Sequence, residues 1–289
     1  TCLPAARQIV VIEARDNLDD SLPIQAAMDK LAHSGGGIVL LPSPDYIIRG
    51  NLNVPTGIEL RGVHDVPHHT MVGGSVLHIY PGNDQPTITM QSSSGLRGLS
   101  FNYPKQRIQA VQQDPFLIQG QGNDLYIVNI NAANAYRYID LMSHRCDRHY
   151  VDYVSGSPLK IGVTIGGGSV GGELRNLQFN PHYWSRAPRE NPLYKNKTNG
   201  GIASGSGKIL WEYQKENLDA LVIAHTVDQF LYQNFVFGSL YGIRFTEQNG
   251  NTRQLQQGLP LASLAKRKVS LVYFGKSECF LLLALKISK

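Results

Sequence analysis

The chain has 289 residues, of which 42% are hydrophobic and 17% charged, so it is long enough for one large globular domain with a buried core. Residues 251–289 hold seven of the 27 Lys and Arg residues and one of the 22 acids, so the preceding 250 residues are nearly neutral and no nucleic-acid partner is expected. The longest apolar run, Cys279 to Leu285, is far shorter than the ~20 residues of a membrane span, so no span is expected.

The first predicted element is a helix at about residues 21–34. Ser21 is the predicted N-cap, Pro23 lies in the first turn, and Gly35–Gly37 ends the helix. Its apolar residues follow helical spacing at Ile24, Ala27, Met28 and Leu31.

Short strands separated by Gly and Asn turns follow the helix. They are predicted in IVLLP, YIIRG, NLNVPTG and IELRGV, and at residues 75–80, 87–90, 95–101, 125–130, 160–165, 172–179, 220–224, 230–237 and 242–245. Since no helix-length periodic segment separates most of them, the pattern indicates a sandwich, a barrel or a solenoid.

An internal repeat favours the solenoid. RGLSF (97–101), RNLQF (175–179) and QNFVF (233–237) place Gly or Asn after a long polar residue and end in Phe, and YIVNINA (126–132) is a looser relative. Gly and Asn tolerate the left-handed backbone that turns a coil. The prediction is an all-β solenoid; a β-sandwich with a coincidental repeat is the alternative.

The N-terminal stretch carries the most specific pattern. After an Asp-rich turn come Ile24-Gln25-Ala26-Ala27-Met28-Asp29, Gly35–Gly37, Leu40-Leu41-Pro42, Tyr46, Val54-Pro55 and Arg61-Gly62. In this order they resemble the opening of pectate-lyase-superfamily β-helix domains, which are related to glycoside hydrolase family 28. The resemblance implies a right-handed parallel β-helix whose N-terminal helix caps the open end, and a polysaccharide or oligosaccharide partner.

The resemblance extends over about residues 12–250, so one β-helix domain is expected at residues 1–250. Residues 251–289 form an atypical basic segment, which we expect to be truncated or non-native. The polysaccharide partner implies a secreted or cell-surface protein, although the chain starts without a signal-peptide pattern, and it is compatible with membership of a larger multidomain protein.

The reaction stays open at this stage. The polygalacturonase motifs Asn-Thr-Asp, Gly-Asp-Asp, Gly-His-Gly and Arg-x-Lys are absent, and no local loop gathers calcium ligands, so no cofactor is expected. Hydrolysis needs two carboxyl groups across the scissile bond, whereas a lyase needs a base and a cation. A glycoside hydrolase, a polysaccharide lyase and a non-catalytic glycan-binding or adhesin-like scaffold are therefore all retained.

The segment IDLMSHRCDRHYVD is the densest candidate for chemistry, with Asp140, Arg145, Asp147 and His149 as predicted catalytic residues. On a strand, Arg145, Asp147 and His149 share one face, where an arginine and a carboxylate tune a proton acceptor. The alternative is a solvated loop or a structural ion-pair ladder. Cys146 in this segment is predicted to be a small buried residue.

Aromatic residues are the predicted substrate-binding groups. His182, Tyr183 and Trp184 in FNPHYWSR are expected to form a platform for sugar rings, unless they pack onto the solenoid instead. Trp211 lies in a predicted excursion at residues 188–217 that walls the groove, and Asp228 joins the same groove if the coils stack. His68 and His69 are adjacent, so a shared metal is not expected; no metal site is predicted.

Overall fold

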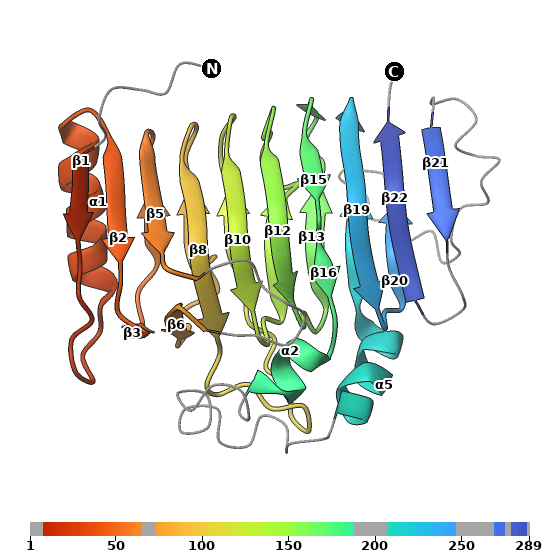
Figure 1. Cartoon of the computed structure of the whole chain (residues 1–289), viewed down its shortest axis with the longest axis horizontal. Coiled ribbons are helices and arrows are strands. Elements are labelled where there is room, and N and C mark those ends of the chain that lie inside the picture. The colour runs from red at the N-terminus through yellow and green to blue at the C-terminus, as the bar shows by residue number, and fades with distance from the viewer. Residues whose placement is uncertain (1–7, 65–72, 188–206, 247–268, 275–278, 288–289) are drawn as a thin grey trace.

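The computed structural model describes residues 8–64, 73–187, 207–246, 269–274 and 279–287. Two long sheets lie against each other along the molecule, and the strands of each follow one another from coil to coil (Figure 1). All strand pairs among the described residues are parallel except those made by the last two strands. The fold is a right-handed parallel β-helix, as predicted.

We call the sheet that faces the viewer in Figure 1 the front sheet. Its strands are, in order, β1 (Gln8–Val11), β2 (Gly37–Leu41), β5 (Ile58–Gly62), β8 (Gly95–Asn102), β10 (Tyr126–Ala132), β12 (Tyr150–Gly156), β15 (Glu173–Arg175), β19 (Gln229–Phe237), β22 (Cys279–Ile287) and β21 (Val269–Phe274). Beside this path lie β3 (Asp45–Ile48), β6 (Ser75–Ile79) and β16 (Gln178–Phe179).

The back sheet has seven strands. They are, in order, β20 (Tyr241–Phe245), β17 (Asp219–Ile223), β13 (Ile161–Ile165), β11 (Arg137–Leu141), β9 (Phe116–Gly120), β7 (Ile88–Met90) and β4 (Leu52–Val54). A short pair, β14 (Ser169–Val170) and β18 (Thr226–Val227), lies in the turns from the back to the front sheet.

The core is a stack of apolar side chains between the sheets. On the front sheet, Val39, Leu60, Leu96, Ile127, Val151, Leu174 and Leu231 are in register and at most 1% exposed. On the back sheet the matching stack runs from Leu52 to Leu221. Side chains alternate along a strand, so the residues between these positions point outward and form two outer faces.

The front strands bend at one stacked position with left-handed backbone. Its residues are Gly98, Asn129, Tyr153, Asn176 and Gln233, with φ between 48° and 64°. The predicted repeats RGLSF, RNLQF and YIVNINA place their Gly or Asn here, so this part of the repeat is confirmed.

The third predicted repeat, QNFVF, is displaced by one residue. Gln233, not Asn234, takes the left-handed position. Asn234 is buried, its Oδ1 accepts from Leu177 N at 3.0 Å, and its Nδ2 donates to Leu174 O at 3.0 Å. The amide is therefore used inside the solenoid, where it satisfies backbone groups.

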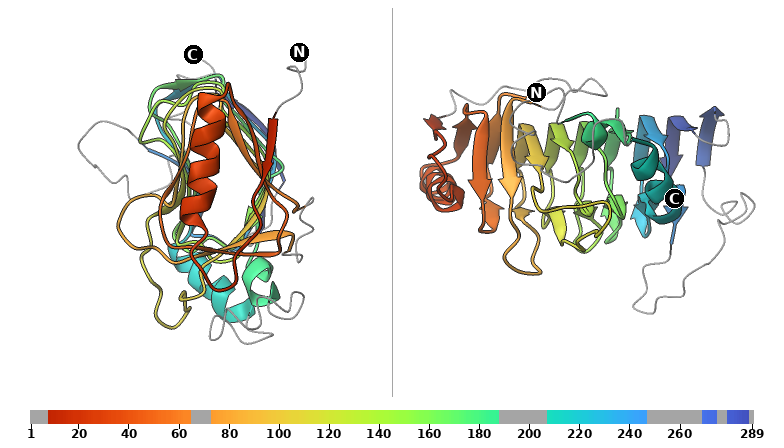
Figure 2. Two further views of the ribbon diagram at one scale, coloured as in Figure 1. Left: turned by 90° about the vertical axis from the view of Figure 1, so that its left-hand side faces the viewer. Right: turned by 90° about the horizontal axis from the view of Figure 1, so that it is seen from below.

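Helix α1 (Ser21–His33) lies across the N-terminal end of the solenoid (Figure 2). It buries Ile24, Met28 and Leu31 against the first coil. Ser21 is the first helical residue and not the N-cap, which corrects the prediction; Asp19 Oδ1 accepts from Ser21 N at 3.0 Å and from its hydroxyl at 2.6 Å. Its role as a protective cap stays a prediction.

The C-terminal strands extend the front sheet. β22 pairs antiparallel with β19, and β21 pairs antiparallel with β22. No strand was predicted in this segment, because its apolar run lacks turn residues. A domain boundary near residue 250 stays a prediction.

Candidate functional site

Charged side chains gather on the outer face of the back sheet, where its strands begin. Arg137, Asp219 and Tyr241 open β11, β17 and β20, and they align across the sheet with Ile161 between the first two. Lys160 directly precedes β13, and Arg244 pairs with Val222, three residues beyond Asp219 on β17. We call Arg137, Lys160, Asp219, Tyr241 and Arg244 the Asp219 cluster.

Asp219 is the acid at the centre of this cluster. Its residue is 4% exposed, and its Oδ2 lies 2.7 Å from Nη2 of Arg244, whose side chain is 36% exposed. The second oxygen, Oδ1, is buried without a hydrogen-bond partner. Burial raises the pKa of Asp219, even though the charges of Arg244 and Lys160 act to lower it. A carboxyl with a raised pKa and a free oxygen beside cations fits a proton-transferring group.

The cations of the cluster outnumber its acid. Arg137, Lys160 and Arg244 are three cations and Asp219 is one acid, so the formal charge of the cluster is +2. In the described part of the chain, neither Arg137 nor Lys160 forms a salt bridge, and the Arg137 guanidinium lies 6.0 Å from the Phe116 ring and 5.6 Å from the Tyr136 ring. The excess of cations in the cluster is suited to an anionic ligand.

Long connections border the cluster. The front and back sheets are joined at this edge by residues 103–115 and by a longer segment that contains α2 (His182–Ser185) and α5 (Gly207–Asn217), seen along the lower edge of Figure 1. α5 leads directly to Asp219: Leu218 N donates to Gln214 O, and Gln214 Nε2 donates to Pro158 O at 2.8 Å. Long connections of this kind commonly carry binding residues on a rigid scaffold.

Asp114 is a second carboxyl of this edge with a perturbed pKa. It lies two residues before β9, and one of its oxygens accepts from Gln106 Nε2 at 3.1 Å. Burial raises its pKa to about 6. β9 is three strands from β17, or ~14 Å at the usual strand spacing, so Asp114 and Asp219 do not form a close pair.

Asp140 lies on the same outer face, at the register position that it shares with Arg244. It is 2% exposed and accepts hydrogen bonds from Gln119 and Thr164 and from the backbone amides of Met142 and Ser143. Burial acts to raise its pKa, but these hydrogen bonds lower it. Because its oxygens are occupied, Asp140 holds the turn after β11 and offers no free base.

The other predicted catalytic residues do not share a face. They occupy the turn before β12, which begins only at Tyr150. Arg145 Nε lies 2.9 Å from both oxygens of Asp147, and this hydrogen bond lowers the pKa of Asp147. His149 points into the solenoid, 1% exposed, with Nδ1 2.7 Å from Cys146 O, and burial lowers its pKa. The structure thus shows Arg145 and Asp147 as an ion pair, in line with the alternative interpretation of this segment.

The predicted sugar platform is also corrected. Tyr183 and Trp184 are fully buried, and Trp184 packs with Leu159 and Leu210. No ring face of these two residues is open to a sugar. His182 stacks on Phe237 with the ring centroids 6.4 Å apart.

Trp211 and Asp228 lie on opposite edges of the front sheet. Trp211 also stacks on Phe237, with the ring centroids 6.2 Å apart. Asp228 is exposed in the turn that precedes β19, where it is stacked with Arg148 and Gly171. In the described part of the chain, the predicted residues therefore form separate groups.

Three further predictions concern cysteine, histidine and metal. Cys146 is fully buried, as predicted. His68 and His69 lie outside the described residues. Within the described ranges, no group of three or more His, Cys, Asp or Glu side chains is placed to hold a metal ion. Nor does any helix there have the length and apolar character to cross a membrane.

Sequence reasoning missed Asp219 and Arg244. Each is a charged residue in an otherwise apolar five-residue strand, DALVI and YGIRF. A single charged residue in an apolar strand is the signal that could have found them, because charged residues are rarely buried unless they are paired or functional.

The sequence matches no protein-family model, and no curated protein matches it. Solved structures similar to the chain include the following three. A candidate glycosyl hydrolase from Parabacteroides merdae has 17% identity and a TM-score of 0.44 over 59% of this chain and 87% of its own. An iota-carrageenase bound to iota-carrageenan fragments has 12% identity and a TM-score of 0.45 over 100% and 68%. The A-module of a mannuronan C-5 epimerase from Azotobacter vinelandii has 14% identity and a TM-score of 0.26, over 79% of this chain and 88% of its own.

The ligands and activities of these three proteins do not carry over to this chain at such low identity. The class defined by the strand pairing is a parallel β-helix protein with a charged cluster on the outer face of its back sheet.

Proposed function

We propose that this protein is a carbohydrate-active β-helix enzyme that cleaves a uronate-containing polysaccharide by β-elimination at the Asp219 cluster. The observation that carries the proposal is the free, buried Oδ1 of Asp219, whose pKa is raised, beside the cations Arg244 and Lys160. A secreted or surface location and membership of a larger protein belong to the same proposal.

The proposed reaction uses each member of the cluster. Arg244 and Lys160 bind the uronate carboxylate and stabilise the charge that develops when the adjacent C5–H bond breaks. Asp219 takes that proton and later releases it to solvent, while the electron pair forms the C4=C5 double bond and the C4–O glycosidic bond breaks. The leaving oxygen takes a proton from Tyr241, the neighbour of Asp219 on β20, which solvent then reprotonates.

Hydrolysis fits the described residues less well. A hydrolase needs two carboxyl groups about 5 to 9.5 Å apart. Among the described acids of this face, Asp140 has its oxygens occupied by four donors, and Asp114 is ~14 Å from Asp219. One free carboxyl with several cations is the donor set of an elimination.

The test is a digest of a panel of acidic and neutral polysaccharides, followed by reducing ends and by ultraviolet absorbance of unsaturated uronates. We expect both signals to rise on an acidic substrate. Asp219→Asn should lower the rate about 100-fold or more, since it removes the base. Asp16→Asn, an exposed carboxyl far along the chain, is the matched control and should keep the rate.

Other outcomes would replace the proposal. Reducing ends without ultraviolet absorbance would indicate a hydrolase. Binding of a polysaccharide by folded protein without new ends would indicate the glycan-binding scaffold. Full activity of Asp219→Asn would place the chemistry elsewhere.

A further inference from the structure

Arg137 is the cation of the Asp219 cluster that has no part in the proposed elimination. It opens β11, and Asp219 occupies the same register position on β17, two strands along the solenoid axis or ~10 Å away. Burial raises the pKa of Asp219, and the charges that act to lower it are those of Arg244 and Lys160. Arg137 is therefore a separate, partly exposed cationic position on the same outer face.

Two aromatic rings hold the Arg137 guanidinium in place. Its central carbon lies 6.0 Å from the centroid of the Phe116 ring, directly opposite on β9, and 5.6 Å from that of the Tyr136 ring. Tyr136 is 7% exposed and belongs to a small apolar cluster with Leu159 and Trp184, so packing fixes its position. The rings attract and orient a cation without neutralising it, so the charge of Arg137 stays available to a ligand.

No acid among the described residues is paired with Arg137. Its side chain forms no salt bridge or hydrogen bond with them, and its buried Nε has no acceptor. Two carboxyls of this face have other partners, since Asp219 lies 2.7 Å from Arg244 Nη2 and Asp140 accepts from four donors. Burial raises the pKa of Asp114, and no cation lowers it. A buried donor without an acceptor has a desolvation cost, which an anion bound at Arg137 would offset.

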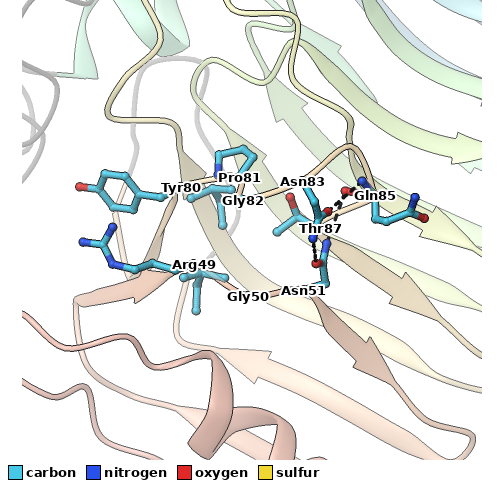
Figure 3. A pocket seen from close by; sticks show the side chains of 11 residues that line it. Arg49, Gly50, Asn51, Tyr80, Pro81, Gly82, Asn83, Gln85 and Thr87 are labelled. Atoms are coloured by element: carbon cyan, nitrogen blue, oxygen red, sulfur yellow. Dashed lines mark hydrogen bonds between the residues drawn. The ribbon is translucent and has the colours of Figure 1, made fainter.

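Arg49 in the first coils shows the opposite case (Figure 3). Its guanidinium carbon lies 4.6 Å from the centroid of the Tyr80 ring, a stacking similar to that of Arg137. Its backbone N–H donates to Asp19 Oδ1 at 3.1 Å. Burial acts to raise the pKa of Asp19, but hydrogen bonds from Ser21 and the charge of Arg49 lower it. The charge of Arg49 is thus compensated within the protein, which makes this arginine the matched control for Arg137.

We propose that Arg137 is a specificity-determining residue that binds the carboxylate of a second uronate in the same polysaccharide chain. Its Nε–H and one Nη–H form the planar fork that receives a carboxylate with two hydrogen bonds. Because Arg137 and Asp219 lie along the solenoid axis, a chain that contacts both runs along the back sheet and carries carboxylates ~10 Å apart. The substrate class is therefore a polyuronate and not a polymer with isolated uronates. The place of the second uronate relative to the cleaved bond rests on the proposed function, whereas carboxylate binding at Arg137 does not.

The test measures oligouronate binding by isothermal titration of the full chain, in an Asp219→Asn background so that the ligand is not cleaved. We expect Arg137→Met to weaken binding of a uronate hexasaccharide about tenfold or more, because the charged fork is lost while the aliphatic contacts with the rings are kept. Arg137→Lys keeps the charge without the fork and should have an intermediate affinity. Arg49→Met removes a stacked arginine of compensated charge and should leave the affinity unchanged.

The outcomes separate this inference from the proposed function. A loss in Arg137→Met that is confined to the acidic hexasaccharide supports carboxylate binding at Arg137, even if the chain cleaves no polysaccharide. An unchanged affinity in that variant overturns the inference, even if cleavage that depends on Asp219 is observed. An equal loss for the fully methyl-esterified hexasaccharide, an equal loss in Arg49→Met, or no oligouronate binding by the parent chain overturns it as well. Urea unfolding checks each variant, and if Arg137→Met does not fold, Arg137→Lys decides by the same comparison.

Discussion

The outer faces of the two sheets carry similar residue types in different arrangements. On the front sheet, the acids Glu59, Asp152 and Glu173 are matched by the three arginines 61, 97 and 175. On the back sheet, the Asp219 cluster holds three cations and one acid. The charges of these front-face residues are paired and balanced. The back-face cluster keeps an excess positive charge and a carboxylate oxygen without a hydrogen-bond partner.

Glu59 shows how the front face closes. Its carboxylate accepts from Tyr126 Oη and pairs with Arg61, and Arg97 Nε lies 3.6 Å away. Gly95 separates Glu59 from Tyr126 on the sheet, and a Cβ there would lie 2.0 Å from Tyr126 Cζ. The glycine therefore makes room for the ring to reach the acid.

The remaining front-face groups are paired in the same way. Asp152 accepts from Tyr150 Oη and from Asn176 Nδ2, both at 2.7 Å. Arg175 lies 3.7 Å from Glu173 and over the Tyr232 ring. Charged and aromatic residues in a row are thus not enough to indicate a site; the uncompensated charge and the unpartnered atom of the back face are the informative features.

The largest stability difference is expected between Glu59→Gln and Asp219→Asn. Glu59→Gln leaves two arginines without their carboxylate and should lower the free energy of unfolding by about 2 to 3 kcal/mol. Asp219→Asn removes a carboxyl that burial disfavours, so we expect a change within about 0.5 kcal/mol or a gain. Urea unfolding at pH 7 measures both. Equal losses of the free energy of unfolding would show that both carboxylates are equally well compensated by their partners.

Local sequence signals predicted most of this architecture. Helix α1, the apolar run of β2 and the strands β6, β7 and β10 lie within two residues of their predicted positions, because apolar periodicity fixes which side of each element is buried. β9, β11 and β12 were missed. Their short apolar stretches, such as FLIQG and RYIDL, carry polar residues that point outward.

The Asp219 cluster was not predictable in this way, because it depends on which coils stack. Partner residues of the back sheet, Ile139, Val163, Leu221 and Ile243, are 24, 58 and 22 residues apart in sequence. The connection that contains α5 lengthens one coil, so the spacing of strands in the sequence does not reveal which residues of β13 and β17 pair. Asp219 and Arg137 therefore reach the same register position, two strands apart, only after the coils have formed.

Asp114, at the edge of the back sheet, gives a pH test of intermediate size. Burial raises its folded pKa to about 6, above the ordinary 3.8, so its contribution to stability is full below pH 3.8 and is lost as the pH rises through 6. Asp114→Asn should remove this loss. Between pH 4 and pH 7 its free energy of unfolding should rise relative to wild type by on the order of 1 kcal/mol, after allowance for solvent screening. Urea unfolding at both values checks it, with Asp16→Asn as the exposed control. An equal pH response of wild type and Asp114→Asn would mean that the carboxyl is well solvated.

His149, at the turn into the front sheet, should show the opposite and smallest dependence. Burial lowers its folded pKa below the ordinary 6.5, so its contribution is present above pH 6.5 and is lost as the pH falls and the unfolded chain takes up the proton. Between pH 7.5 and 5.5 the wild type should lose up to about 1 kcal/mol more than His149→Gln, which cannot be protonated. His144→Gln changes an exposed histidine of the same turn and should keep the wild-type response. If His149→Gln kept that response as well, His149 would have to open to water in the folded state, and the front turn would be as accessible as the back-sheet edge.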